Sequence, residues 1–288
     1  MSGVVTCLTC AIAMAADAWG APIPLTANEH PWGQFLPNSW CIVQTVTISD
    51  FEGRAVQSSQ TVRMTLQSVE ANRITWQESE TLEVGGKIDQ KQPRIIKQDF
   101  FQEPIQDNVR ISQGTPVKLM IEKEKKVVPC AIRIYEQRTS GGILTTTIWY
   151  TPNVYPYIFR VEKILRTIPE GEGTSGQIVR SSVMLVQETS ALKTLRSSRR
   201  NRTYTQQTVE KVGNTTKITD ARCSCDVPGG LLESTTREFD AQNKEIRRCV
   251  SRMTNYFACD PSQRYRNWAV PVPIPVPVPV PVHVETVP

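Results

Sequence analysis

Apolar and polar residues alternate along many stretches of the chain, and the first begins at Trp40. In WCIVQTVTIS, the apolar residues Trp40, Ile42, Val46 and Ile48 share one phase of a period-two pattern. Alternation of this kind, rich in β-branched residues, predicts a strand. The stretches TVRMTLQSVE and ITWQESETLEV repeat the pattern, and turn residues such as Gly53 separate the stretches.

Further strands are predicted after Val117. The stretches that carry the pattern are VKLMIE, VVPCAIRIYEQ, ILTTTIWY, YIFRVEKIL, QIVRSSVMLVQET, TYTQQTVEKV, TTKITDARCSC, LLESTTREF and KEIRRCVSRMTNYF. Residues 87–109 are less regular and fit a short helix or a long loop, so no element is predicted there. No long segment has a helical period, which argues against a parallel α/β fold.

The pattern therefore predicts a mostly β fold, with an antiparallel sheet or sheets in a sandwich or a half-barrel. This β domain spans residues 40–260, and two related halves, 40–168 and 177–260, would explain a faint internal echo between its Val-Pro turns. The competing interpretation is that strands joined by Pro turns resemble one another through composition alone.

The two ends of the chain differ from this domain. Residues 1–21 form an apolar run with small residues at Ala18 and Gly20, and the first 53 residues contain no Lys or Arg. The apolar run and the small residues predict a signal peptide and export to the periplasm, envelope or medium, although the usual positive n-region is missing. A mis-assigned start or a buried N-terminal segment is the alternative. Residues 22–39, rich in Pro, are expected to be an irregular lead-in. No later segment is long and apolar enough to predict a transmembrane helix.

Residues 261–288 form a tail in which VPVPIPVPVPVPV places proline at every second position. Proline and the residue before it both favour extended backbone, so an extended arm is predicted. Two interpretations stay open: a free spacer, or a one-sided edge strand that pairs through its valine N–H groups.

The charge of the chain is informative in one segment only. The formal net charge of +5 over 288 residues is mild, so nucleic acid is an unlikely partner. One basic segment without acidic residues suggests contact with an anionic surface, with a solvated loop as the alternative. Its cationic residues are Lys193, Arg196, Arg199, Arg200 and Arg202.

Six cysteines remain after the predicted signal peptide, and an even number in an exported protein predicts disulfides. They are Cys41, Cys130, Cys223, Cys225, Cys249 and Cys259. One plausible scheme joins Cys223 or Cys225 to Cys249, and Cys41 to Cys130. Zinc is disfavoured because the C-x-C spacing offers poor bite geometry, so neither a metal nor another cofactor is expected.

A ligand groove is predicted at the densest aromatic patch, around NVYPYIF. Its candidate residues are Trp149, Tyr155, Tyr157 and Phe159. Catalytic signatures are missing from the sequence. The chain has two histidines, His30 and His283, and both lie outside the predicted sheet. A carboxylate pair of the glycosidase kind stays open, because any two acidic residues can meet in the fold. Glu78 and Glu80 would share a strand face, but exposed strand faces carry such residues routinely.

Several segments together resemble a group of uncharacterised exported β-rich bacterial proteins, over residues 30–257. These segments are HPWGQFLPNSWCIVQT, VPCAIRIYE, WYTPNVYPYIFRVE, DVPGGLLEST and RRCVSRMTNY. More distantly, the strand-after-strand plan is similar to periplasmic lipoprotein carriers, whose curved antiparallel sheet cups an acyl chain. That likeness is architectural, and no binding residues follow from it.

The sequence thus favours a non-enzymatic exported protein that binds an apolar or envelope ligand, such as a lipid, or serves as an envelope interaction module. A secreted hydrolase acting through carboxylates and a purely structural protein with a spacer tail are the alternatives.

Overall fold

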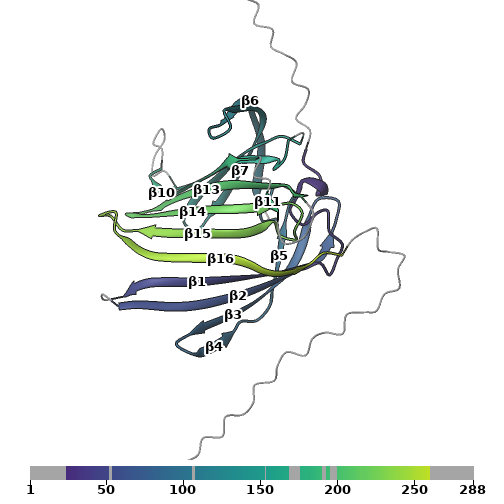
Figure 1. The fold of residues 1–288 in the computed structure, drawn as a ribbon. Coiled ribbons are helices and arrows are strands. Elements are labelled where there is room, and N and C mark those ends of the chain that lie inside the picture. The colour runs from purple at the N-terminus through teal and green to yellow at the C-terminus, as the bar shows by residue number, and fades with distance from the viewer. Residues whose placement is uncertain are drawn as a thin grey trace, which may run out of the picture.

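A computed structural model describes residues 24–51, 54–105, 108–152, 154–168, 176–189, 193–194 and 200–259. The predicted signal peptide and the Val-Pro tail lie outside the described residues. Within the described part, nearly all regular structure is β, in one antiparallel sheet of fourteen strands (Figure 1). The prediction of a mostly β antiparallel fold is confirmed, but its strands form one open sheet and not a two-sheet sandwich.

The sheet begins with strands from the N-terminal third of the chain. In sheet order they are β4 (Lys87–Gln90), β3 (Ile74–Val84), β2 (Arg54–Val69) and β1 (Trp40–Phe51), and β5 (Arg94–Gln98) also pairs with β3. Gly85 and Gly86, with φ of 57° and 78°, form the β3–β4 turn. Successive positive φ angles match the twist of a tight hairpin and favour glycine.

The order continues through β1, which pairs with the last strand of the chain. The remaining strands, in sheet order, are β16 (Glu245–Phe257), β15 (Leu231–Phe239), β14 (Thr215–Ser224), β13 (Thr203–Val212), β10 (Ile178–Glu188), β9 (Ile158–Arg166), β8 (Gly142–Tyr150), β7 (Lys126–Thr139) and β6 (Val109–Ile121). A separate small pair joins β11 (Lys193–Thr194) and β12 (Arg200–Asn201). The edge strand β6 carries Pro116 at an irregularity in its pairing, where a missing N–H is tolerated.

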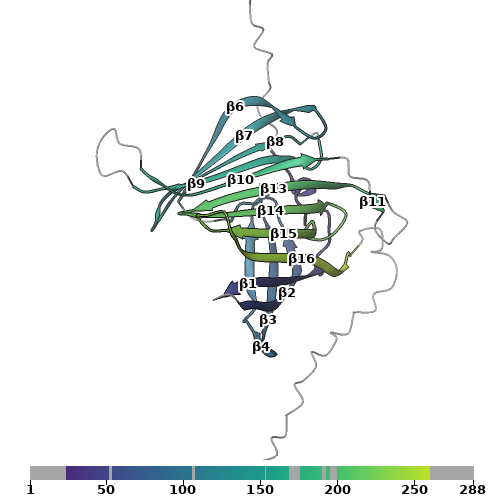
Figure 2. The same ribbon diagram turned by 60° about the vertical axis from the view of Figure 1, so that its left-hand side comes forward.

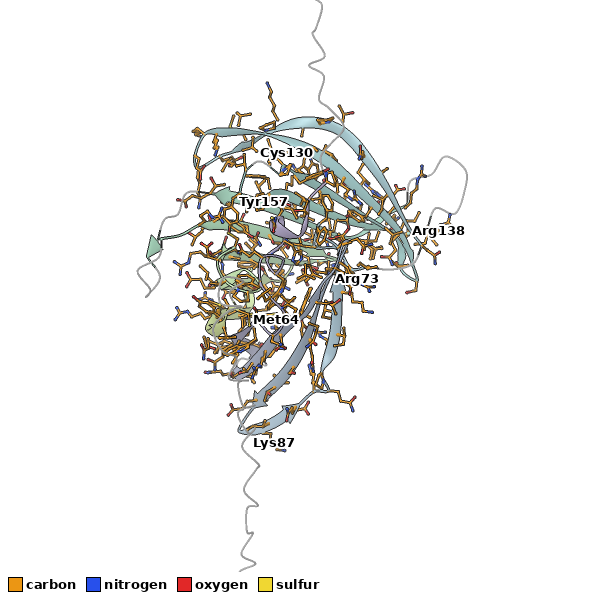
Figure 3. The ribbon with its side chains drawn as sticks, turned by 90° about the vertical axis from the view of Figure 1, so that its right-hand side faces the viewer. Met64, Arg73, Lys87, Cys130, Arg138 and Tyr157 are labelled. Atoms are coloured by element: carbon orange, nitrogen blue, oxygen red, sulfur yellow. The ribbon has the colours of Figure 1, made fainter. Side chains whose placement is uncertain are left out.

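Strands of the two predicted halves share this single sheet. Those of residues 177–260 occupy its middle, and those of residues 40–168 lie at both ends. The duplication itself stays a prediction. The sheet bends strongly, so its two ends form diverging arms (Figure 2). Figure 3 shows Cys130 and Arg138 in one arm and Lys87 at the tip of the other.

Two segments cover one face of the bent sheet, which we term the inner face. The cap, residues 24–39, contains a short 3-10 helix, Ala27–Glu29. The crossing segment, residues 99–105, follows β5 at one end of the sheet and leads to β6 at the other. Phe100 of this segment packs against apolar clusters of both arms, so the crossing segment ties the arms together.

Two apolar clusters of the core lie beneath these segments, and a third, which includes Cys130, Phe159 and Val186, contains no residue of either segment. Trp32 and Phe35 of the cap pack on Cys41, Leu66, Ile74 and Trp76. Leu25 and Phe101 pack on Tyr135, Ile148, Tyr150 and Ile158 in the opposite arm. The predicted lead-in is therefore irregular, as expected, but it supplies the side chains that bury the inner face where a second sheet would otherwise be needed.

Candidate functional site: a capped cavity

A cavity of about 620 Å³ lies between the cap, the crossing segment and the β6–β7 arm. Most of its wall is aliphatic or aromatic. The residues that line it are Pro24, Leu25, Thr26, Ala27, Glu70, Ala71, Asn72, Asp99, Phe100, Phe101, Pro104, Ile105, Val109, Ile111, Arg133 and Tyr135. Ligand sites for small molecules commonly have this size and this mixture of an apolar wall with a few polar groups.

Asp99 shapes the crossing segment and fastens it to β7. One carboxylate oxygen accepts the backbone N–H groups of Phe101, at 2.9 Å, and Glu103, at 3.0 Å. The other oxygen accepts the phenolic O–H of Tyr135 at 2.6 Å. Burial and the neighbouring Asp99 both raise the pKa of Tyr135, so the phenol stays protonated and donates this bond.

Arg133 completes this polar group on the cavity wall. Its Nε–H donates to the Tyr135 oxygen at 2.9 Å. The guanidinium carbon lies 4.5 Å from the centre of the Phe101 ring and 5.3 Å from that of Tyr135. Contact with two rings holds the cation in place.

His30 anchors the cap from within. Its Nδ1 accepts the backbone N–H of Trp32 at 3.1 Å, which assigns the remaining proton to Nε2. Burial lowers the pKa of His30 to about 4, although the side chain of Gln98 acts in the opposite direction. The imidazole is therefore neutral near pH 7 and serves as a structural acceptor within the cap.

The aromatic residues predicted to form a groove lie elsewhere, at a packed corner. Tyr155 meets Tyr157 and Tyr204 edge to face at 5.6 and 5.4 Å, and its oxygen accepts the N–H of Cys225 at 2.8 Å. Phe159 is fully buried, and Trp149 lies beneath the guanidinium of Arg160. None of the four predicted residues lines the cavity described above. Their role in binding stays a prediction.

The predicted basic segment is described only in part. The backbones of Lys193 and Arg200 belong to β11 and β12, but their side chains, and all of Arg196 and Arg199, lie outside the described residues. The Arg202 guanidinium lies 3.9 Å from Asp226 and over the ring of Tyr155 at 5.5 Å. An anionic contact at this segment stays a prediction.

The disulfide prediction is wrong for the described cysteines, all six of which are free thiols. Cys223 and Cys225 cannot reach Cys249 as proposed, because β15 separates β14 from β16. Cys41 and Cys130 belong to different apolar clusters. Burial raises the pKa of both to about 12, which keeps these thiols protonated. Cys259, also free, lies in the segment after β16.

Two of the three acidic residues of β3, Glu78 and Glu80, are engaged in ion pairs. Glu78 lies 2.7 Å from Arg94, and Glu80 pairs with Lys91. Glu78 also accepts the indole N–H of Trp76 at 3.0 Å. Among the described residues, no cluster of three or more His, Cys, Asp or Glu side chains could hold a metal ion. In the same part of the chain, no helix has the length and apolarity needed to cross a bilayer.

Sequence reasoning missed the cavity because its polar residues carry a weak signal. Arg133 and Tyr135 alternate with Ile132 and Ile134, so the alternation predicts that the isoleucines form the buried face of this stretch. In the structure Tyr135 is 7% exposed, and both isoleucines are only half-buried. The signal that could have indicated the site is a charged residue, Arg133, on the same strand face as an aromatic residue, Tyr135.

Comparison with known proteins leaves the chain without a family. No family model matches it, and no curated protein matches it. A Vibrio parahaemolyticus domain, described as an outer membrane lipoprotein-sorting protein, is a similar solved structure. The two share 10% identity, and the match covers 78% of this chain and 88% of that chain, with a TM-score of 0.33. Similarity this loose carries no argument about function.

Proposed function

We propose that this chain is a non-catalytic binding protein that encloses one apolar small molecule in the cavity beneath its cap. The observation that carries the proposal is the cavity of about 620 Å³ with a largely aliphatic and aromatic wall. Binding of an apolar guest in a preformed apolar space of this kind is favourable, because apolar surface is removed from water.

The entrance is consistent with this function. Ile105 and Ile111, which line the cavity, are 45% and 49% exposed. Large apolar side chains gathered at a rim often mark a ligand-binding opening. The export expected from residues 1–21 belongs to the same proposal: in the cell envelope, membrane-derived amphiphiles would be the available guests.

Displacement of an environment-sensitive apolar dye tests this function. Ile111→Trp places a larger ring at the rim of the cavity and should weaken dye binding by about tenfold or more, a loss of roughly 1.4 kcal/mol or more in binding free energy. Val117→Trp is the matched control, since it lies on the same strand, is 38% exposed and does not line the cavity.

Both variants should keep the melting temperature of the unchanged protein. A dye that binds all three proteins equally would place its site elsewhere. Dye binding that is absent from the unchanged protein, together with an empty native mass spectrum after incubation with lipid extract, would reject the proposal.

A further inference from the structure

The polar groups of the cavity wall differ in how many of their hydrogen-bonding positions are already occupied by other protein groups. Among the described residues that line the cavity, Arg133 alone carries a positive charge. Its Nε–H is used by Tyr135, and none of the described carboxylates lies within ion-pair distance of it. A guanidinium has five N–H donors, so most of its donor capacity is unassigned.

The carboxylates on the same wall are already engaged. Asp99 accepts two backbone N–H groups and the Tyr135 hydroxyl, which occupy both of its oxygens. Glu70 lies on the β2–β3 turn and is paired with Arg73 at 2.6 Å. The hydrogen-bonding capacity that remains for a guest is therefore concentrated on the cation.

From this difference we propose that the cavity selects single-chain amphiphiles with an anionic end, and that Arg133 binds the anion. This inference rests on the proposed function, because it names the guest of the same cavity. The apolar chain would lie along Leu25, Phe101 and Val109, and the carboxylate would accept the outer N–H groups of Arg133. A guanidinium stacked on aromatic rings is weakly hydrated, so it exchanges water for a carboxylate at low cost.

The cation is a specificity group and not the main source of affinity. Burial of the alkyl chain contributes binding free energy to any guest of the same length. The Arg133–anion contact adds to it only when the guest carries an acceptor with charge. A fatty acid should therefore bind more tightly than the corresponding alcohol, and the difference in affinity should depend on Arg133.

Competition of hexadecanoic acid and hexadecanol against the apolar dye tests this difference at mildly alkaline pH, with each probe below its limit of monomeric solubility. The affinity for the acid should be at least about tenfold higher than for the alcohol, as a charge-assisted hydrogen bond predicts. Arg133→Met keeps the apolar stem and removes the charge, so it should abolish the preference while leaving alcohol affinity unchanged. Arg133→Lys should retain part of the preference.

Arg138→Met is the matched control, since Arg138 is exposed on the same strand β7, in the same arm as Cys130 (Figure 3). This variant should keep the full preference. Equal affinity of acid and alcohol for the unchanged protein would overturn the role of Arg133 but leave the cavity proposal standing. An equal loss of both probes in Arg133→Met would assign Arg133 a structural role instead. Absence of binding by either probe would reject the proposed function itself.

Discussion

The inner face of the sheet has two ends with different chemistry. Beneath the cap it is apolar, with Leu66 and Ile74 fully buried. Farther from the cap, on other strands, the same face carries hydroxyl groups that pair across strands: Thr45 with Ser251 at 2.8 Å, and Thr219 with Thr236 at 2.9 Å. Charged pairs follow beyond them, such as Lys217 with Glu210 at 3.8 Å.

This change occurs within single strands. On β1, the inner-face residues Cys41 and Val43 are buried near the cap, whereas Thr45 and Thr47 lie half-buried farther on. Residues directly opposite in an antiparallel pair share a face, so the neighbouring strands repeat the same gradient. An open sheet has no second sheet to bury its inner face, so on β1 the buried side chains are the ones near the cap. The capped end should hold most of the stability and the uncapped end little.

The largest expected effect is at the capped end, in Trp32→Ala. Trp32 is 3% exposed and stacks on Trp76 with ring centres 6.2 Å apart. Its removal leaves a cavity between the cap and the sheet, which should cost about 3–5 kcal/mol of unfolding free energy. Urea denaturation followed by fluorescence measures this loss. Trp40→Ala on the opposite face of β1, where the ring is only half-buried, should cost clearly less. Equal losses would contradict the importance of the cap.

A second effect concerns the pH dependence of the cap. The pKa of His30 is about 4 in the folded protein and near 6.5 when exposed. The unfolded chain therefore binds more protons than the folded one between these values, and stability falls as pH drops from about 6.5 to 4. The full shift corresponds to roughly 3 kcal/mol.

Denaturation midpoints measured across this window test the contribution of His30. His30→Asn keeps an acceptor for the Trp32 N–H but does not titrate, so the slope of stability against pH should flatten in this variant. An unchanged slope would mean that His30 does not cause the acid sensitivity. Carboxylates whose pKa is lowered by an ion pair, such as Glu80 beside Lys91, lose stability as pH falls, whereas Glu103, whose pKa is raised by burial, has the opposite effect.

The comparison of the two ends also explains how far the sequence could predict the structure. Alternation correctly predicted most strands, because a period of two is a local property. The alternation did not predict which face of each strand is buried. In β1 the apolar phase of Trp40 and Ile48 lies on the outer face, where Ile48 is 47% exposed, and the buried face carries Cys41 and Val43. Burial follows the cap, whose position depends on contacts between distant segments.

The candidate site was beyond sequence reasoning for the same reason. Its walls come from the cap, the β2–β3 turn, the crossing segment, β6 and β7, and only the fold brings these together. No element was predicted in residues 87–109, yet they contain β4, β5 and the crossing segment. The cysteine pairing failed because it required β14 and β16 to be neighbours, and strand order cannot be derived from spacing along the chain.

The smallest effect is expected at the uncapped end, in the double variant Thr219→Val and Thr236→Val. The two hydroxyls bond each other across β14 and β15 at 2.9 Å and are half-buried. Valine keeps the shape and the strand preference of threonine, and removing both partners leaves no unsatisfied polar group. The double variant should therefore lose less than about 1 kcal/mol, the range of a cross-strand pair. A double-mutant cycle in urea separates the coupling of the two hydroxyls from their individual contributions. A loss as large as that of Trp32→Ala would mean that the hydroxyl-lined end is also core, and the contrast between the two ends would not stand.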